Sequence, residues 1–200
     1  MKIIIASISN SILRIMDRLN SVVRTTAALN SCISGHSFRV LSAGRVINLQ
    51  HEPEKIKIGD WSRINGEVLV FAHGGSIKIG SWFYLGPRSS IWSSSSVGIT
   101  IGDHVLVSYD VSIHDTNSHS LNHSERATQT KEMFIHGHSN YNSGIKASPI
   151  SIGSHVWIGS SVKIFRGSVI GDNSIIGAGS IVKGIVEPDS IIPAGSIVDT

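Results

Sequence analysis

Aliphatic residues return every six positions along most of this chain. The longest uninterrupted run consists of Ile152, Ile158, Ile164, Ile170, Ile176 and Val182. An α-helix repeats every 3.6 residues and a half-buried strand every two, so a period of six fits neither. It predicts a short strand, a corner and then a new face, with each aliphatic residue stacked above its equivalent in the next coil.

Shorter runs with the same period precede and follow the long one. They contain Ile58, Ile64 and Val70, then Ile79, Leu85 and Ile91, then Ile101, Val107 and Ile113, and finally Ile192 and Val198. Glycine often follows the aliphatic residue, as at Gly59 and Gly153. We interpret these glycines as corner residues, because glycine adopts backbone conformations that β-branched residues resist. The sequence therefore predicts a solenoid.

Composition supports β structure and narrows the possible partners. Hydrophobic residues make up 40% of the chain and aromatic residues only 6%. The net charge is +3, without a basic run that would indicate nucleic-acid binding. Cys32 is the single cysteine and fits a reducing compartment. Since no apolar run has the length of a membrane span, we expect a cytoplasmic protein.

The N-terminal segment has a helical pattern instead of the six-residue period. Ile8, Ile12, Ile15, Leu19 and Val22 are spaced as on one face of a helix. We therefore expect a short amphipathic helix over residues 9–30 that packs on the main body. Attachment to a membrane surface is the alternative. The chain thus divides into residues 1–35, a helical segment, and residues 36–200, the repeat domain.

One long interruption breaks the repeat. It runs over residues 114–148, has no period of six, and is rich in His, Asn, Ser and Thr. A loop of this length inside a compact repeat is usually functional or disordered. We expect a protruding loop that carries the chemistry of the protein.

The segment VSIHDTNSHSLNHSER, followed by PISIGSHVWIGSSVKI, resembles the acetyltransferase branch of the hexapeptide-repeat family. That branch includes galactoside, maltose, nodulation-factor and capsule or lipopolysaccharide O-acetyltransferases, and the resemblance covers roughly residues 56–198. It implies an all-β fold, a left-handed parallel β-helix with three faces. It also implies a homotrimer with active sites between subunits, acetyl-coenzyme A as donor, and no tightly bound cofactor.

The resemblance places the catalytic base on His119. A sugar hydroxyl is a poor nucleophile near neutral pH, and a neutral imidazole can take its proton during attack on the thioester. Asp115 is our candidate for holding the tautomer of His119, although a backbone carbonyl would serve equally. Ser160 is the candidate donor to the developing oxyanion.

The same match assigns a coenzyme-binding edge. Trp157 would form an apolar wall for the coenzyme, and lysines beyond it would meet its phosphates. A tryptophan packed on a coil and solvated lysines explain these residues as well. The expected coenzyme-binding residues are Trp157, Gly159, Ser160, Lys163, Gly177 and Lys183.

A group of aromatic and polar residues near the loop is the candidate acceptor site. Aromatic rings stack on sugar faces, and arginine can meet a carboxylate on an acidic sugar. Packing between coils is the alternative. Members of the maltose type often carry Asn where this chain has Gly86, and the C-terminal ending IIPAGSIVDT also departs from their pattern. We therefore expect a surface polysaccharide or its precursor as acceptor. The expected acceptor-binding residues are Trp82, Tyr84, Arg88, Trp92 and Asn117.

Three other functions compete with this interpretation. One is an N-acetyltransferase acting on an amino-sugar nucleotide, and another is a non-catalytic β-helix scaffold. The third is a zinc hydratase of the γ-carbonic anhydrase type, which needs three imidazoles on one metal. Two positions that match its ligands are Ser160 and Phe165, so we expect no metal.

Overall fold

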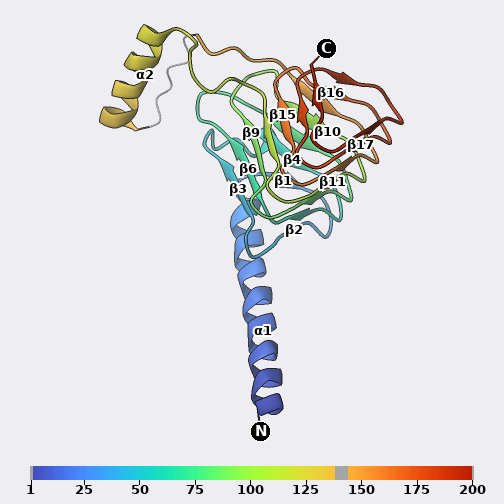
Figure 1. The fold of residues 1–200 in the computed structure, drawn as a ribbon. Helices are drawn as coiled ribbons and strands as arrows, with labels where there is room; N and C mark the ends of the chain where they lie inside the picture. The colour runs from blue at the N-terminus through green and yellow to red at the C-terminus, as the bar shows by residue number, and fades with distance from the viewer. Residues whose placement is uncertain (1, 138–143, 200) are drawn as a thin grey trace.

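Three parallel seven-stranded sheets form the body of the protein in a computed structural model, which describes residues 2–137 and 144–199. Successive strands pass from sheet A to sheet B to sheet C and back, so the chain coils into a left-handed parallel β-helix (Figure 1). Helix α1 precedes the coils, and helix α2 interrupts them. The six-residue period thus predicted the architecture correctly.

The strands are short and follow one another in the same order in every coil. Sheet A contains β1 (Ile33–Ser34), β4 (Ile56–Ile58), β7 (Ile77–Ile79), β10 (Ile99–Ile101), β13 (Ile150–Ile152), β16 (Val169–Ile170) and β19 (Ile185–Val186). Sheet B contains β2 (Arg39–Val40), β5 (Arg63–Ile64), β8 (Tyr84–Leu85), β11 (Leu106–Val107), β14 (Trp157–Ile158), β17 (Ile175–Ile176) and β20 (Ile191–Ile192). Sheet C contains β3 (Arg45–Asn48), β6 (Glu67–Val70), β9 (Ser90–Ser93), β12 (Ser112–His114), β15 (Lys163–Phe165), β18 (Ile181–Val182) and β21 (Ile197–Val198). A 3₁₀ turn, η1 (Pro53–Lys55), precedes β4.

The core is a column of aliphatic side chains enclosed by the three sheets. In sheet A the strand register places Ile77 beside Ile99, and Ile99 beside Ile150. All three side chains are buried. Burial of each such side chain contributes about 1.5–3 kcal/mol, so the repeat is stabilised coil by coil.

The glycines of the repeat act differently from our prediction. The left-handed backbone conformation falls two residues after these glycines, on non-glycine residues such as Trp61 and His104, where φ is 57°. The glycines are needed for close approach instead. A Cβ on Gly159 would lie 2.7 Å from the backbone nitrogen of Ala178 in the next coil. The corner interpretation was therefore wrong, because coil spacing, not φ, selects glycine.

The departures from the six-residue period all occur at one corner of the β-helix. Residues 71–76, 94–98 and 115–149 each connect a strand of sheet C to the next strand of sheet A. Since successive coils stack, these three insertions lie above one another along the same edge. The regular parts of the repeat build the core, and the irregular parts build a surface feature at this corner.

Helix α1 (Lys2–Leu29) is longer than predicted and is not packed along the body. It leaves the N-terminal end of the β-helix and points away from it (Figure 1). Ile12, Ile15, Leu19 and Val22 are between 55% and 61% exposed, so the predicted apolar face does not dock on its own chain. The expectation was wrong because only the C-terminal turns of α1 reach the coils.

Helix α2 (His123–His136) lies within the segment that we predicted to be a loop. The side chain of Asn122 caps its N-terminus by accepting hydrogen bonds from Ser124 N and Glu125 N. Gly137 ends it with a φ of 80°. The helix was missed because it has little apolar periodicity and buries only Gln129. Within the described residues, neither helix is both long and apolar enough to cross a membrane.

Candidate active site

A cavity of about 820 Å³, including its open mouth, lies where the three corner insertions meet helix α2. Sheet C forms its floor through outward-facing side chains, and α2 forms one wall. The insertions supply the remaining sides. Its lining consists of Phe71, His73, Trp92, Ser94, His114, Thr116, Ser118, His119, Gln129, Met133 and Ile145.

Asp115 anchors the start of the third insertion. Its carboxylate is fully buried and accepts hydrogen bonds from Ser93 Oγ (2.6 Å), Ser94 N (3.0 Å) and Ser95 Oγ (3.2 Å). Ser93 ends β9, and Ser94 and Ser95 begin the insertion of the preceding coil, so one carboxylate ties two insertions together. Among the described hydrogen bonds, none joins Asp115 to His119. The structure therefore does not bring Asp115 to the imidazole that we expected it to orient.

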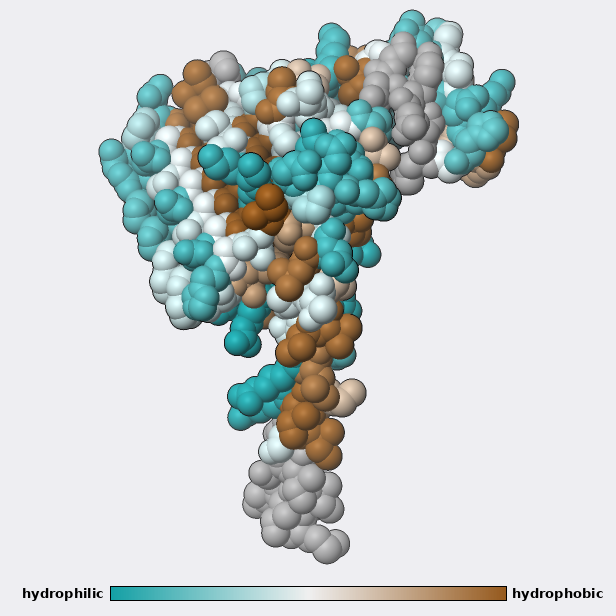
Figure 2. Space-filling model, turned by 180° about the vertical axis from the view of Figure 1, so that it is seen from behind, coloured by the Kyte–Doolittle hydropathy of each residue, from teal (hydrophilic) through white to brown (hydrophobic). Residues whose placement is uncertain are grey.

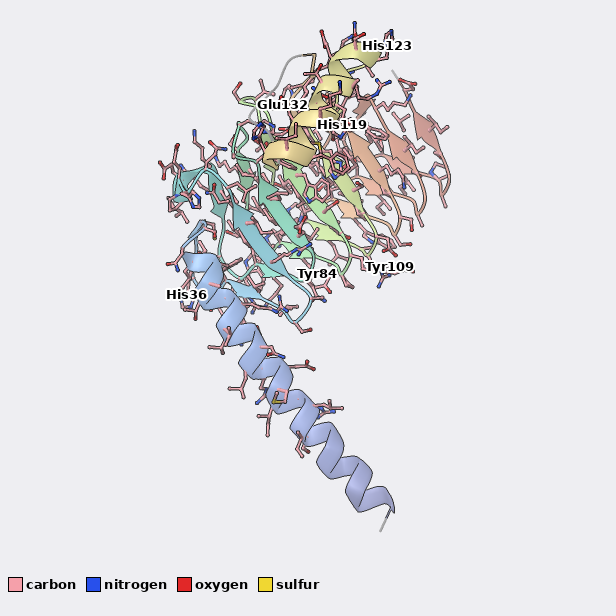
Figure 3. All side chains as sticks on the ribbon, turned by 90° about the vertical axis from the view of Figure 1, so that its left-hand side faces the viewer. His36, Tyr84, Tyr109, His119, His123 and Glu132 are labelled. Carbon is pink, nitrogen blue, oxygen red and sulfur yellow. The ribbon has the colours of Figure 1, made fainter. Side chains whose placement is uncertain are left out.

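His119 lies at the mouth of the cavity on a tightly held stretch of backbone. Its N–H donates to the carbonyl of Asn117 (2.7 Å), and the preceding residue, Ser118, has a φ of 61°. Asn117 is held in turn by Lys146, whose N–H donates to Asn117 Oδ1 at 2.7 Å. The side chain of His119 is exposed and lies beneath α2 (Figure 3). It can therefore meet a substrate that enters the cavity.

The next residue, Ser120, connects the histidine to helix α2. Its N–H donates to Gln129 Oε1 (3.2 Å), and its hydroxyl donates to Glu125 Oε2 (2.5 Å). Its carbonyl accepts from Arg126 (2.9 Å). The helix thus fixes the chain on one side of His119, while Asn117 fixes it on the other.

His114 is a second imidazole of the cavity, and the sequence analysis gave it no role. It stacks on Trp92 with ring centroids 4.6 Å apart and planes 1° from parallel, because the two residues are partners in strand register. Its Nε2 lies 3.2 Å from the hydroxyls of Ser90 and Ser112. Burial lowers the pKa of His114 to about 4, so its imidazole is neutral at pH 7. The sequence did contain a signal for this residue, because the repeat places His114 directly beside Trp92 of the preceding coil.

The low pKa of His114 predicts a pH-dependent stability. A histidine with a lowered folded-state pKa stabilises the fold above its unfolded value, here 6.5, and this contribution is lost as the pH falls toward 4. Between pH 7 and about pH 4.5 the free energy of unfolding should fall by about 2 kcal/mol from this residue alone. Urea unfolding of wild type and His114→Gln at both pH values measures it as the loss that the variant lacks.

An exposed histidine of the same segment provides the control. His123→Gln should lose stability with acid as much as wild type does, since its side chain lies in solvent at the start of α2. If His114→Gln and wild type lose the same stability on acidification, His114 is not buried in the neutral form.

A second cavity adjoins the first on the far side of His114. Asn117, Phe165 and Arg166 contribute to its lining. Lys183 also lines it, and its ammonium pairs with Asp199 at 2.5 Å. Asn117 Nδ2 is buried and has no hydrogen-bond partner within the described part of the chain.

The remaining predicted coenzyme-binding residues do not line either cavity. Trp157 faces outward from sheet B, where it pairs with Leu106 and is 49% exposed. Gly159 and Ser160 follow it at the corner between sheets B and C. Lys163 is exposed on sheet C. Within one chain, the His119 cavity and the Trp157 edge thus lie on different faces of the β-helix.

The predicted acceptor-binding residues are also dispersed. Trp82 stacks between Trp61 and His104 at the corner between sheets A and B. Tyr84 faces outward from sheet B, away from His119 (Figure 3). Arg88 forms a bidentate ion pair with Asp110. Trp92 alone joins His119 in the first cavity, because neighbours in sequence point to different faces of a solenoid. The expectation of one cluster was wrong.

Gly177 has the same packing role as Gly159. A Cβ there would lie 2.4 Å from the backbone nitrogen of Ala194. Both glycines therefore have a structural explanation that needs no coenzyme. In the described ranges, no group of three or more His, Cys, Asp or Glu side chains is arranged to hold a metal ion.

Parts of the chain match known families and proteins. The model of the bacterial transferase hexapeptide (six repeats) matches residues 149–184, and that of the hexapeptide repeat of succinyl-transferase matches residues 169–200. Galactoside O-acetyltransferase of Escherichia coli (strain K12) is 39% identical over 127 residues, which cover 64% of this chain and 54% of the relative. "Probable acetyltransferase Rv3034c" of Mycobacterium tuberculosis is 30% identical over 155 residues, which cover 76% of this chain and 46% of the relative. This chain thus spans about half the length of these curated relatives.

A solved structure shares the fold. The crystal structure of AntD, an N-acyltransferase from Bacillus cereus in complex with dTDP and 3-hydroxybutyryl-CoA, matches with a TM-score of 0.60 at 20% identity. The match covers 80% of this chain and 78% of AntD. The repeat, the three-sheet β-helix and the matched family models together identify the chain as a hexapeptide-repeat protein, and over part of their length it is similar to known acetyltransferases.

Proposed function

We propose that this protein transfers an acetyl group from acetyl-coenzyme A to a hydroxyl of a carbohydrate, with His119 as general base. The observation that carries the proposal is the position of His119, at the mouth of a cavity built from three insertions that interrupt the repeat. A scaffold would have no need of such a cavity. The galactoside O-acetyltransferase relative supports a hydroxyl of a carbohydrate as acceptor.

The chemistry requires one base and no covalent enzyme intermediate. The imidazole of His119 takes the proton of the acceptor hydroxyl as its oxygen attacks the thioester carbon. Collapse of the tetrahedral intermediate breaks the carbon–sulfur bond, and the coenzyme thiolate recovers the proton from the imidazolium. Holding both substrates together supplies much of the acceleration.

The donor site requires a second subunit in this proposal. Trp157 and Ser160 lie on a different face from His119 of the same chain. A homotrimer would place the Trp157 edge of one subunit beside the His119 cavity of its neighbour. The thioester would then lie along Trp157, and Ser160 would donate to the oxyanion. Lys163 remains a candidate for the coenzyme phosphates, whereas Lys183 already pairs with Asp199.

The acceptor would occupy the cavity itself. The face of the Trp92–His114 stack offers an apolar contact, and the hydroxyl and imidazole groups of the lining offer polar contacts. A sugar ring presents matching features, a C–H face and hydroxyl edges. A surface polysaccharide or its precursor fits this open cavity, which an extended chain could cross.

Two measurements on the purified protein test the proposal. Calorimetry should detect coenzyme A binding, and Trp157→Ala should weaken it while leaving the melting temperature unchanged. Release of free thiol from acetyl-coenzyme A should then identify acceptors among polysaccharide fragments and amino-sugar nucleotides. Undetectable coenzyme A binding would favour the scaffold, and acetylation of an amine alone would show N-transfer instead.

A further inference from the structure

Helix α1 contacts the β-helix through its polar side. Ser21 Oγ donates to the carbonyl of Val40 (2.7 Å), and Thr25 Oγ1 accepts from Val40 N–H (2.9 Å). Arg24 donates to the carbonyl of Gly44 at 3.1 Å. These contacts hold one side of the helix to the first coil, so the opposite side faces away from the body.

That opposite side carries an apolar seam, defined here as Ile12, Ile15, Leu19 and Val22. The residues are spaced by three, four and three positions, which is the a and d pattern of a seven-residue repeat. In the sequence the same pattern continues back to Ile5 and Ile8. All four seam side chains are more than half exposed, and the body of the same chain covers none of them.

The seam contains no charge. Arg14, Asp17 and Arg18 fall between its residues in the sequence and therefore on the other sides of the helix. Figure 2 shows this division, with hydrophobic residues along one side of the projecting helix and hydrophilic residues on another. Covering the seam would thus bury apolar surface without desolvating an ionised group.

The exposed seam is costly in an isolated chain. Burying such side chains stabilises a helix, and a helix without tertiary packing is marginal in water. We propose that the seams of three copies of this chain pack together as a parallel coiled coil. Isoleucine at both the a position (Ile12) and the d position (Ile15) favours three or more strands over two. This inference goes beyond acyl transfer and does not depend on it.

A membrane surface is the other possible occupant of an amphipathic helix. Arginines at Arg14, Arg18 and Arg24 could face lipid headgroups. The contacts of Arg24 and its neighbours already hold the polar side of the last turns against the first coil. The 3–4 spacing of the seam is that of a coiled coil, and the exposed Met16 and Val23 widen it on one side. The observations therefore favour a second and third copy of the chain, and lipid binding becomes an outcome of the test.

Cysteine cross-linking of the full chain tests the seam directly. Ile15→Cys and Leu19→Cys place thiols on the seam, and Leu13→Cys is the matched control, since Leu13 is 59% exposed but lies off the seam. The native Cys32 gives little background, because burial raises the pKa of its thiol to about 11. With a short trifunctional maleimide, which can join one thiol from each of three chains, the seam variants should form covalent dimers and trimers, and Leu13→Cys should stay monomeric on a denaturing gel.

Three results would overturn the proposal. One is equal cross-linking at Leu13 and at the seam, and another is cross-linking at neither. The third is co-sedimentation of wild type with phosphatidylglycerol vesicles together with loss of seam cross-linking in their presence. The double variant His119→Ala/Ile15→Cys should cross-link as Ile15→Cys alone does. Failure of the catalytic proposal and failure of this one are therefore distinguishable.

Discussion

Replacing His119 by alanine should lower acetyl transfer by roughly 10²–10⁴-fold, the usual contribution of a general base. The imidazole is exposed at the mouth of the cavity, and its described backbone contacts do not involve the side chain. The loss should therefore appear in the rate of thiol release from acetyl-coenzyme A, while the melting temperature stays within the error of wild type. Coenzyme A binding should also be preserved, because the proposed coenzyme contacts come from Trp157 and its neighbours and not from the imidazole of His119.

A second histidine of the same segment separates catalysis from general disturbance. His123 is exposed at the start of α2, four residues away in sequence and outside the cavity lining. His123→Ala should transfer acetyl groups at the wild-type rate. The assignment of the base fails if His119→Ala keeps full activity, or if both variants lose activity to the same extent.

The repeat made the fold predictable because solenoid stability is a sum of nearly identical contacts. Each aliphatic residue meets its equivalents in neighbouring coils, as Ile99 meets Ile77 and Ile150, so position in the sequence fixes position in space. The glycines were located correctly for the wrong reason. Their role depends on the distance to the next coil, and that distance is a tertiary quantity.

The candidate site was only partly predictable. His119 was found because the break in the repeat and the family motif marked it. The break in the six-residue period that contains Phe71 and His73 was visible in the sequence. That this break lies at the same corner as the His119 segment becomes clear only when each strand is assigned to one of the three sheets. Trp82 and Tyr84 were grouped with Trp92 because they are close in sequence. In a β-helix, residues a few positions apart in the sequence lie on different faces.

Helix α2 shows where local patterns fail. Gln129 is the one buried residue of this helix, so its sequence has no apolar stripe from which a helix could be predicted. Contacts from Gln129 and Glu125 to Ser120 connect it to the chain beside His119 instead. A helix held by polar contacts to a functional loop leaves no periodic signal.

The buried carboxylate of Asp115 carries the second large effect. Asp115→Ala should lower the free energy of unfolding by about 3 kcal/mol, because it leaves the hydroxyls of Ser93 and Ser95 and the N–H of Ser94 without their acceptor. Urea unfolding at pH 7 measures the change. Asp110→Asn is the matched control, since it removes an exposed ion pair with Arg88 that should contribute little, and asparagine tolerates the left-handed backbone at this position (φ 60°).

A comparison of Asp115→Ala with Asp115→Asn decides what Asp115 does for His119. If it anchors the insertion, Asp115→Ala loses stability and activity together, and Asp115→Asn, which keeps an acceptor oxygen for two of the three donors, recovers part of both. If it instead acts on the imidazole, as first expected, Asp115→Asn should shift the pH profile of transfer with little change in stability. The distances to Ser93, Ser94 and Ser95 favour the anchor, because both carboxylate oxygens are already engaged there. Acid should therefore destabilise the cavity by protonating the buried His114. Removal of the Asp115 carboxylate should destabilise it by freeing the insertions that this side chain holds together.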